Sequence, residues 1–208
     1  MTGRTRRGKR WMDEHVDDEF VRRAKLEGWR SRAVYKLIEI QEKDRVLKPN
    51  MTVVDLGAAP GAWSQYAAKA VGHRGRVIAV DLLPMDPLPG VEFIQGDFRE
   101  QETLDALEAA LGDVAPGLVM SDMAPNISGV PSVDQPRAMY LAELALEFAR
   151  ARLTPGGALV TKMFQGEGSE ALVRAARADF GTVRTRKPKA SRDRSREVYL
   201  VAGNYRVM

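Results

Sequence analysis

One stretch decides the fold of this chain: Asp55-Leu56-Gly57-Ala58-Ala59-Pro60-Gly61-Ala62-Trp63-Ser64. A β-branched run (52–54) precedes it and favours a strand, and a helix-compatible segment (65–71) follows it. A strand, a turn with glycines and a helix N-terminus let a ligand approach the backbone closely, because Gly57 and Gly61 carry no Cβ. The stretch therefore predicts a ligand-binding turn.

The spacing of these glycines narrows the kind of ligand. It is not the dinucleotide fingerprint G-x-G-x-x-G, and no G-x-x-x-x-G-K-[ST] phosphate loop occurs in the chain. An acidic residue before the turn, and no lysine in it, suit a cofactor that lacks phosphates. S-adenosylmethionine is such a cofactor. In isolation, a plain strand-to-helix turn would look the same, so the rest of the chain must decide.

Length and composition exclude several classes of protein. The 208 residues, 44% of them apolar, suffice for one globular domain. The chain lacks the apolar run of about 18 residues that a membrane span needs, and its basic start lacks the apolar core of a signal peptide. With no cysteine and only His15 and His73, we expect no disulfide and no metal site. We expect a cytoplasmic protein.

Predicted strands and helices alternate along the chain, which favours a mostly parallel sheet covered on both faces. The predicted strands are 52–56, 76–81, 91–95, 117–122, 158–163, 182–187 and 197–201. The predicted helices are 29–42, 62–71, 102–111, 136–152 and 169–180. A loop rather than a helix joins the last two strands, so the final strand should be antiparallel. We expect a basic N-terminal extension (1–28) and one domain (29–208).

Polar residues stand where four of these strands end. Asp81 ends the second strand and can accept both ribose hydroxyls of an adenosine, whereas Asp97 follows the third and can accept from the adenine amino group. Asp122 ends the fourth strand, and Lys162 lies near the end of the fifth. A carboxylate at a strand end is often only a cap or turn residue. Four polar residues at one sheet edge, where ligands bind in such sheets, indicate a site.

Lys162 is the most informative single residue. It interrupts the apolar strand Ala158–Phe164, which we expect to be buried on both faces. A lysine is rarely left there without a partner, although it could also extend from the strand end to solvent. Desolvation and a neighbouring cation would let Lys162 act as a base near neutral pH.

The net charge of +4 is modest, but the basic residues are clustered. Residues 1–32 contain ten Lys/Arg, and residues 184–196 contain seven. Such clusters suit a phosphate backbone, although a solvated charged face is the commoner explanation for any single run, and six acidic residues dilute the first cluster. The candidate RNA contacts are Arg4, Arg6, Arg7, Lys9, Arg10, Arg32, Arg192, Arg194 and Arg196.

Five phrases in order resemble a known family. They are Ser31-Arg32-Ala33-Val34-Tyr35-Lys36-Leu37, Asp55 through Ser64, Ser121-Asp122-Met123-Ala124-Pro125-Asn126, Lys162-Met163-Phe164-Gln165-Gly166 and Ser195-Arg196-Glu197-Val198-Tyr199. Together they resemble the FtsJ/RrmJ family of S-adenosylmethionine-dependent ribose 2'-O-methyltransferases. The likeness runs from about Ser31 to Tyr205, and it is greatest to the bacterial members that methylate a uridine in the A-loop of large-subunit (23S) rRNA.

This resemblance implies a Rossmann-like methyltransferase fold with a seven-stranded sheet, and a set of site residues. The implied catalytic tetrad is Lys36, Asp122, Lys162 and Glu197. The implied cofactor-binding residues are Gly57, Gly61, Trp63, Asp81, Asp97 and Asp122. The chain departs from the family at Ala62, where a second glycine often stands.

The resemblance implies S-adenosylmethionine as cofactor and ribosomal RNA, within the large ribosomal subunit, as partner. We expect a monomer without membrane or metal. Two alternatives stay open: the same chemistry on tRNA or an mRNA cap, and a non-catalytic RNA-binding or ribosome-assembly protein on the same fold. An intact tetrad beside an intact cofactor turn favours the enzyme, and the short chain favours rRNA over the other RNAs.

Overall fold

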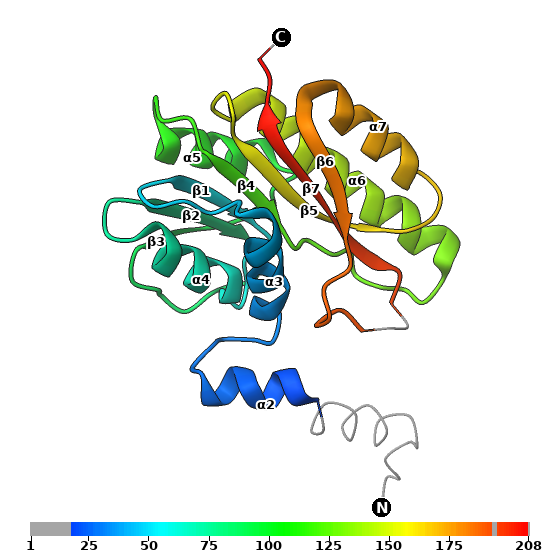
Figure 1. Cartoon of the computed structure of the whole chain (residues 1–208), viewed down its shortest axis with the longest axis horizontal. Helices are drawn as coiled ribbons and strands as arrows, with labels where there is room; N and C mark the ends of the chain where they lie inside the picture. The colour runs from blue at the N-terminus through cyan, green and yellow to red at the C-terminus, as the bar shows by residue number, and fades with distance from the viewer. Residues whose placement is uncertain (1–17, 193–194, 208) are drawn as a thin grey trace, which may run out of the picture.

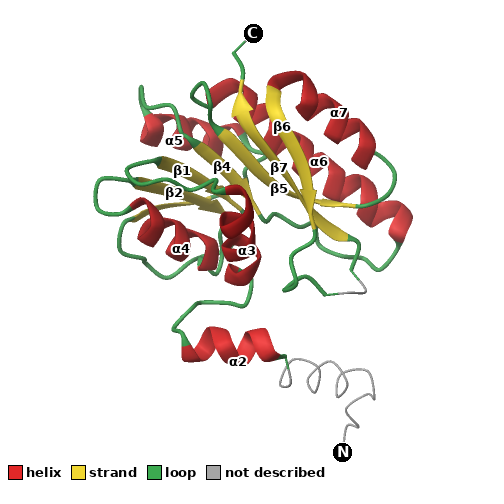
Figure 2. Cartoon of the chain, in the orientation of Figure 1, coloured by secondary structure: helices red, strands yellow, loops and turns green. Residues whose placement is uncertain are grey.

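A computed structural model describes residues 18–192 and 195–207 of the chain. These residues form one seven-stranded sheet with helices against both of its faces (Figures 1 and 2). The strands are β1 (Thr52–Leu56), β2 (Arg76–Asp81), β3 (Val91–Gln95), β4 (Leu118–Ser121), β5 (Ala158–Phe164), β6 (Phe180–Arg186) and β7 (Glu197–Tyr205). The helices are α2 (Glu19–Leu26), α3 (Val34–Asp44), α4 (Ala62–Val71), α5 (Gln101–Leu111), α6 (Pro131–Arg152) and α7 (Ser169–Asp179).

The strand order is β3-β2-β1-β4-β5-β7-β6. Strands β1 to β5 are parallel where they pair, and β7 runs antiparallel to both of its neighbours. The order reverses at β1, so the loops after β1 and β4 meet at the edge where such sheets bind ligands. The prediction of a mostly parallel sheet with an antiparallel last strand is confirmed.

Two apolar layers hold the helices on the sheet. On one face, Val53 and Val160 pack with Leu37 of α3 and Ala67 of α4. On the other face, Val54 and the residues of the neighbouring strands that share its side of the sheet pack against α5, α6 and α7. Successive strand residues point to opposite faces, so one run of β-branched residues supplies both layers. All five side chains named here are fully buried, a burial that typically stabilises by about 1.5–3 kcal/mol for each large aliphatic group.

Several element boundaries differ from the sequence-based prediction. Helix α6 begins at Pro131, five residues before the predicted start at Pro136, because the Asp134 carboxylate accepts from the N–H groups of Ser128 and Gly129 and anchors the first turn. Helix α3 begins at Val34 rather than Trp29. Residues 29–33 form a bend and a turn rather than a helix, and the N–H of Arg30 donates to the Gln65 side chain. The other boundaries agree within four residues.

A helix that the sequence analysis did not predict lies in the predicted basic extension. In α2, the side chain of Asp18 caps the N-terminus by accepting from the N–H of Phe20 (3.0 Å). Ala24 packs against Val34 and Tyr35, so this helix is joined to the start of α3. None of the helices in the described ranges is long and apolar enough to span a membrane.

A buried carboxylate ties the end of α3 to the edge strand β6. Asp44 accepts from Nε and Nη2 of Arg186, at 2.8 and 2.7 Å, and its side chain is 2% exposed. Arg184 adds a third, longer contact of 3.6 Å. These two arginines belong to the basic cluster at 184–196, so part of that charge serves the fold.

We expect Asp44→Ala to lower the free energy of unfolding by about 2–3 kcal/mol, because it leaves the Arg186 guanidinium half-buried and unpaired. Urea unfolding measures this effect. The control is Glu92→Ala, which breaks the exposed pair with Arg76 and should cost less than about 1 kcal/mol. Equal losses in the two variants would show that Asp44 is an ordinary surface residue.

Candidate active site

Four charged side chains from four elements meet at the carboxyl edge of the parallel strands. Lys36 comes from the first turn of α3, Asp122 follows β4, Lys162 lies in β5, and Glu197 begins β7. Lys162 Nζ lies 3.1 Å from Asp122 Oδ1, and Lys36 Nζ lies 2.7 Å from Glu197 Oε1 and 3.9 Å from Asp122 Oδ2. The structure therefore brings together the four residues that the resemblance implied as a tetrad.

Asp122 is the centre of this cluster. Its side chain is 19% exposed, and burial alone would raise the pKa of its carboxyl. The ammonium groups of Lys162 and Lys36 outweigh burial and hold that pKa below its ordinary value. The backbone carbonyl of Asp122 also accepts from Lys162 Nζ at 2.6 Å. Two of the three N–H groups of the Lys162 ammonium are thus directed at one residue, and no acceptor for the third is found within 18–192 and 195–207.

Tyr199 is a site residue that the sequence analysis did not assign. It is fully buried, and its hydroxyl donates to Asp122 Oδ1 at 2.6 Å and lies 3.1 Å from Glu197 Oε1. Burial raises the pKa of this phenol well above its ordinary value, and the adjacent carboxylates add to the effect. A usable signal was present, because Glu197 and Tyr199 are two residues apart on one strand and so share a face.

A cavity of about 460 Å³ opens beside Lys36 and Glu197. The loop between β6 and β7 forms part of its wall, including Ser191, whose hydroxyl donates to Glu197 Oε1 at 3.1 Å. Arg32 and Arg192 also line it. The ion pair of Lys36 and Glu197 thus lines a space that two arginines also line.

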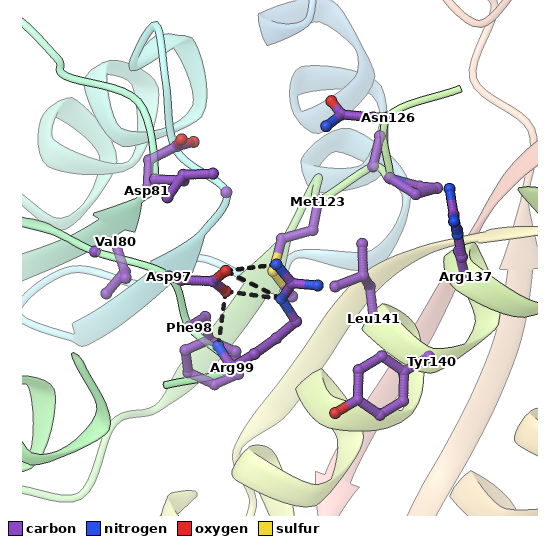
Figure 3. A pocket seen from close by; sticks show the side chains of 15 residues that line it. Val80, Asp81, Asp97, Phe98, Arg99, Met123, Asn126, Arg137, Tyr140 and Leu141 are labelled. Carbon is purple, nitrogen blue, oxygen red and sulfur yellow. Dashed lines mark hydrogen bonds and ion pairs between the residues drawn. The ribbon is translucent and has the colours of Figure 1, made fainter. Parts of the chain in front are cut away.

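A second cavity, of about 370 Å³, lies at the ends of β1, β2 and β3 (Figure 3). Gly57, Asp81 and Asp97, three of the predicted cofactor residues, line it. Asp81 accepts from the N–H groups of Ala59 (2.8 Å) and Leu83 (2.8 Å), which fixes its carboxylate at the rim. Each carboxylate oxygen has a further lone pair for a ligand hydroxyl.

The Asp97 carboxylate is paired with Arg99, two residues further along the chain. The side chain of Arg99 donates to both of its oxygens, at 2.5 to 3.1 Å, and hydrogen bonding to Arg99 lowers the pKa of the Asp97 carboxyl. Figure 3 shows the guanidinium over the carboxylate, with Asn126, Arg137 and Tyr140 on the other side of the cavity. The sequence analysis did not assign these last three residues: nothing local indicated that Arg137 and Tyr140 of α6 would reach this cavity, and Asn126 was quoted only as part of a motif.

The two glycines of the turn are required by protein contacts. A Cβ on Gly57 would lie 2.6 Å from Met123 Cγ, and one on Gly61 would lie 2.7 Å from Met85 Sδ. Both glycines also have positive φ, at 77° and 102°. Trp63 is 3% exposed, donates its indole N–H to the carbonyl of Ala33 at 2.8 Å and packs on Tyr199. Trp63 does not line the cavity as described, and its predicted contact with a cofactor stays a prediction.

The residues predicted to contact RNA lie in different environments. Six of them lie outside the described residues: Arg4, Arg6, Arg7, Lys9, Arg10 and Arg194. Arg192 and Arg196 are exposed beside the larger cavity, whereas Arg32 forms an ion pair with Asp18. Lys187, in the same basic cluster, donates to the backbone carbonyls of Ser195 and Glu197 and shapes the loop. In the described ranges, no three His, Cys, Asp or Glu residues are grouped to hold a metal.

Comparison with known proteins shows the family of the chain. The model of the FtsJ-like methyltransferases matches residues 29–205. The chain belongs to this family. A Plasmodium falciparum structure described as a ribosomal RNA methyltransferase is 32% identical, covers 85% of this chain and 98% of its own, and superposes with a TM-score of 0.77.

A second structure, described as an rRNA methylase from Clostridium thermocellum, is 16% identical and superposes with a TM-score of 0.55. It covers 81% of this chain and 96% of its own, and at this identity it supports the fold alone. The methyltransferase family and its fold are therefore established for this chain, and the residues of the matched region include the whole tetrad.

Asp55, the acidic residue of the turn, faces the protein interior and not a cavity. It is fully buried, Ser64 Oγ donates to its Oδ2 at 2.6 Å, and its Oδ1 has no hydrogen-bond partner. Burial raises the pKa of this carboxyl from 3.8 to about 7. The folded protein therefore keeps a proton here that the unfolded chain releases at lower pH.

This shift predicts a pH dependence of stability. Between pH 3.8 and about 7, the contribution of Asp55 to stability should fall as the pH rises, and it should be constant above that range. Asp55→Asn keeps an acceptor for Ser64 and removes the ionisation, so its stability relative to wild type should rise over the same range. Urea midpoints from pH 4 to 8 test this; the exposed Asp113→Asn variant is the control, and parallel curves for Asp55→Asn and wild type would contradict the prediction.

Proposed function

We propose that this protein transfers a methyl group from S-adenosylmethionine to a ribose 2'-hydroxyl of RNA. The observation that carries the proposal is the tetrad itself, in which two lysines and two carboxylates are in contact. Lys36 and Glu197 line one cavity, and Met123, the residue after Asp122, lines the other. The more specific proposal is a uridine in the A-loop of large-subunit (23S) rRNA, as in the bacterial proteins that the five sequence motifs resemble.

The smaller cavity fits the cofactor. Its volume of about 370 Å³ is in the range of small-molecule sites, and carboxylates from two strand ends face it. Asp81 suits the ribose hydroxyls and Asp97 the adenine amino group, since both are hydrogen-bond acceptors. S-adenosylmethionine supplies an electrophilic methyl group on a positively charged sulfur.

The tetrad can prepare the hydroxyl. As a neutral amine, Lys162 is positioned to take up the hydroxyl proton, and as an ammonium group it can stabilise the alkoxide that develops on the oxygen. Among the described residues, only Asp122 contacts its nitrogen, which leaves one position on that nitrogen for the hydroxyl. Asp122 orients this ammonium group, and Glu197 orients that of Lys36. The lysines repel each other's charge, whereas the carboxylates hold them in place. Most of the rate enhancement then comes from positioning and proton removal.

The larger cavity suits the RNA. Its volume of about 460 Å³ leaves space for a nucleotide, and Arg192 on its wall suits a flanking phosphate. Arg196 is exposed near this cavity, and an exposed guanidinium suits an RNA backbone. The similarity to a protein described as a ribosomal RNA methyltransferase supports rRNA as the RNA class.

We further propose that the enzyme acts as a cytoplasmic monomer, on rRNA within the large ribosomal subunit. The alternative substrate is tRNA, which shares the chemistry. A purely non-catalytic assembly role is disfavoured, because the lysines and carboxylates of the tetrad are all in contact.

The decisive experiment is to map 2'-O-methyl groups in total RNA from cells with and without this protein. We expect the loss of one large-subunit rRNA methylation and its return when the protein is restored. Loss of a tRNA methylation would assign the alternative substrate, and an unchanged map would refute the enzymatic proposal.

Lys162→Ala should abolish methyl transfer and leave cofactor affinity intact, because Lys162 touches Asp122 but not the smaller cavity. Single-turnover transfer of labelled methyl groups measures the first effect, and calorimetry the second. The exposed Lys69→Ala variant serves as control. Activity within about tenfold of wild type, a change of only about 1.4 kcal/mol in the barrier, would remove Lys162 from the catalytic role.

Asp81→Ala should weaken cofactor binding by about 1.5–3 kcal/mol, the typical value of hydrogen bonds to a charged acceptor. Part of this loss comes from the N–H groups of Ala59 and Leu83, which lose their acceptor. Asp81→Asn separates the two causes, because an amide oxygen still accepts from one N–H group. Unchanged calorimetric affinity in both variants would show that Asp81 is only a turn residue.

A further inference from the structure

Arg32 connects the β6–β7 loop, which forms part of the wall of the larger cavity, to the N-cap residue of helix α2. One nitrogen of the Arg32 guanidinium, Nη1, forms an ion pair with Asp18, and the other, Nη2, donates to the backbone carbonyl of Ala190. The side chains of Arg32 and Asp18 are only 19% and 12% exposed. Arg32 also lies over the ring of Phe20, 5.5 Å from its centroid. This arginine therefore has three protein contacts.

The contact at Ala190 leads directly to the tetrad. The next residue, Ser191, is 3% exposed and donates its hydroxyl to Glu197 Oε1, the oxygen that also receives Lys36 Nζ. Ala190 itself packs with Ala24 of α2 and Val34 of α3 in a small apolar cluster. A continuous series of contacts thus runs from Asp18 through Arg32, Ala190 and Ser191 to Glu197.

We propose that Asp18 and Arg32 are positioning residues that fix this loop, and with it Glu197, for the RNA reaction; this rests on the function proposed above. It differs from the interpretation of Arg32 as a phosphate contact. A guanidinium paired with a carboxylate and a carbonyl has little charge left to attract RNA, whereas its fork geometry is well suited to holding two groups at once.

The two interpretations predict different effects of removing the Asp18 charge, one on the turnover number and the other on RNA affinity. Asp18→Asn keeps the N-cap acceptor for Phe20, so α2 should remain folded. If Arg32 positions the loop, we expect the turnover number for RNA to fall about tenfold, since a small misplacement of a site is costly. If Arg32 binds phosphate directly, the variant should instead bind RNA more tightly, because the guanidinium is released and a negative charge is lost.

The matched control is Glu19→Gln, which removes the same charge one residue away. Glu19 is exposed and forms no ion pair with any residue the structure describes. We expect this variant to retain wild-type turnover. Cofactor affinity should be unchanged in both variants, because neither residue lines the smaller cavity. Equal turnover in Asp18→Asn and Glu19→Gln would overturn the proposal.

Arg32→Lys provides a second, independent test. Lysine keeps the positive charge but has no fork to hold Asp18 and Ala190 together, so we expect turnover to fall while the salt dependence of RNA binding stays the same. Adding Asp18→Asn to Arg32→Lys should cause no further loss if the two residues act through one contact. A wild-type turnover number in Arg32→Lys would contradict the positioning role.

Hydrogen exchange without RNA tests the loop itself and does not depend on the proposed function. The N–H groups of Ser191 and Ser195 bond to the carbonyls of Pro188 and Arg192, each at 2.9 Å. Asp18→Asn should speed exchange at these two sites and leave that of the β5 strand unchanged. If the wild-type protein methylates no RNA, the proposed function fails, but the exchange rates still decide whether the Asp18–Arg32 ion pair fixes the loop. Unchanged exchange at Ser191 and Ser195 in Asp18→Asn would overturn the inference.

Discussion

The structure of the site depends on one constraint: the carboxylate of Asp122 must be kept at the end of β4, between two ammonium groups. Both lysines come from elements distant in sequence, and both are largely removed from water, with side chains 13% and 8% exposed. Two buried cations close together are tolerated only where anions compensate them. Asp122 and Glu197 supply that compensation, and Tyr199 adds a neutral donor between the two carboxylates.

The sheet provides the rigidity that this constraint needs. Lys162 stands opposite Tyr199 in the antiparallel β5–β7 pair, and Glu197 lies opposite Phe164. The register of this one strand pair therefore fixes the positions of three site residues: Lys162, Glu197 and Tyr199. Trp63 packs behind Tyr199 and bonds to the residue before α3, which links the cofactor turn to Lys36. The antiparallel last strand thus has a functional consequence, because it returns a carboxylate to the edge where the parallel strands end.

The basic residues show how differently one kind of side chain can be used. Arg184 and Arg186 neutralise Asp44, Lys187 holds backbone carbonyls, Arg32 joins α2 to a loop, and Arg196 is exposed. A count of charges along the sequence treats these residues as equivalent. Their environments separate them, because a paired and buried guanidinium stabilises the fold, whereas an exposed one is available to a phosphate.

The sequence by itself determined the sheet and the order of its elements, and its resemblance to a family named the four charged residues that the structure brings together. β-Branched runs, the glycine turn and a lysine in an apolar strand are local patterns, and β1, β2, β3 and α4 have the predicted bounds. Tertiary structure alone decided that the Tyr199 hydroxyl reaches Asp122 at the end of another strand, that Asp55 is buried away from the cavities, and that Arg32 is paired with Asp18. The physical reason is that burial, register and charge pairing depend on residues far apart in the chain, which no local pattern records.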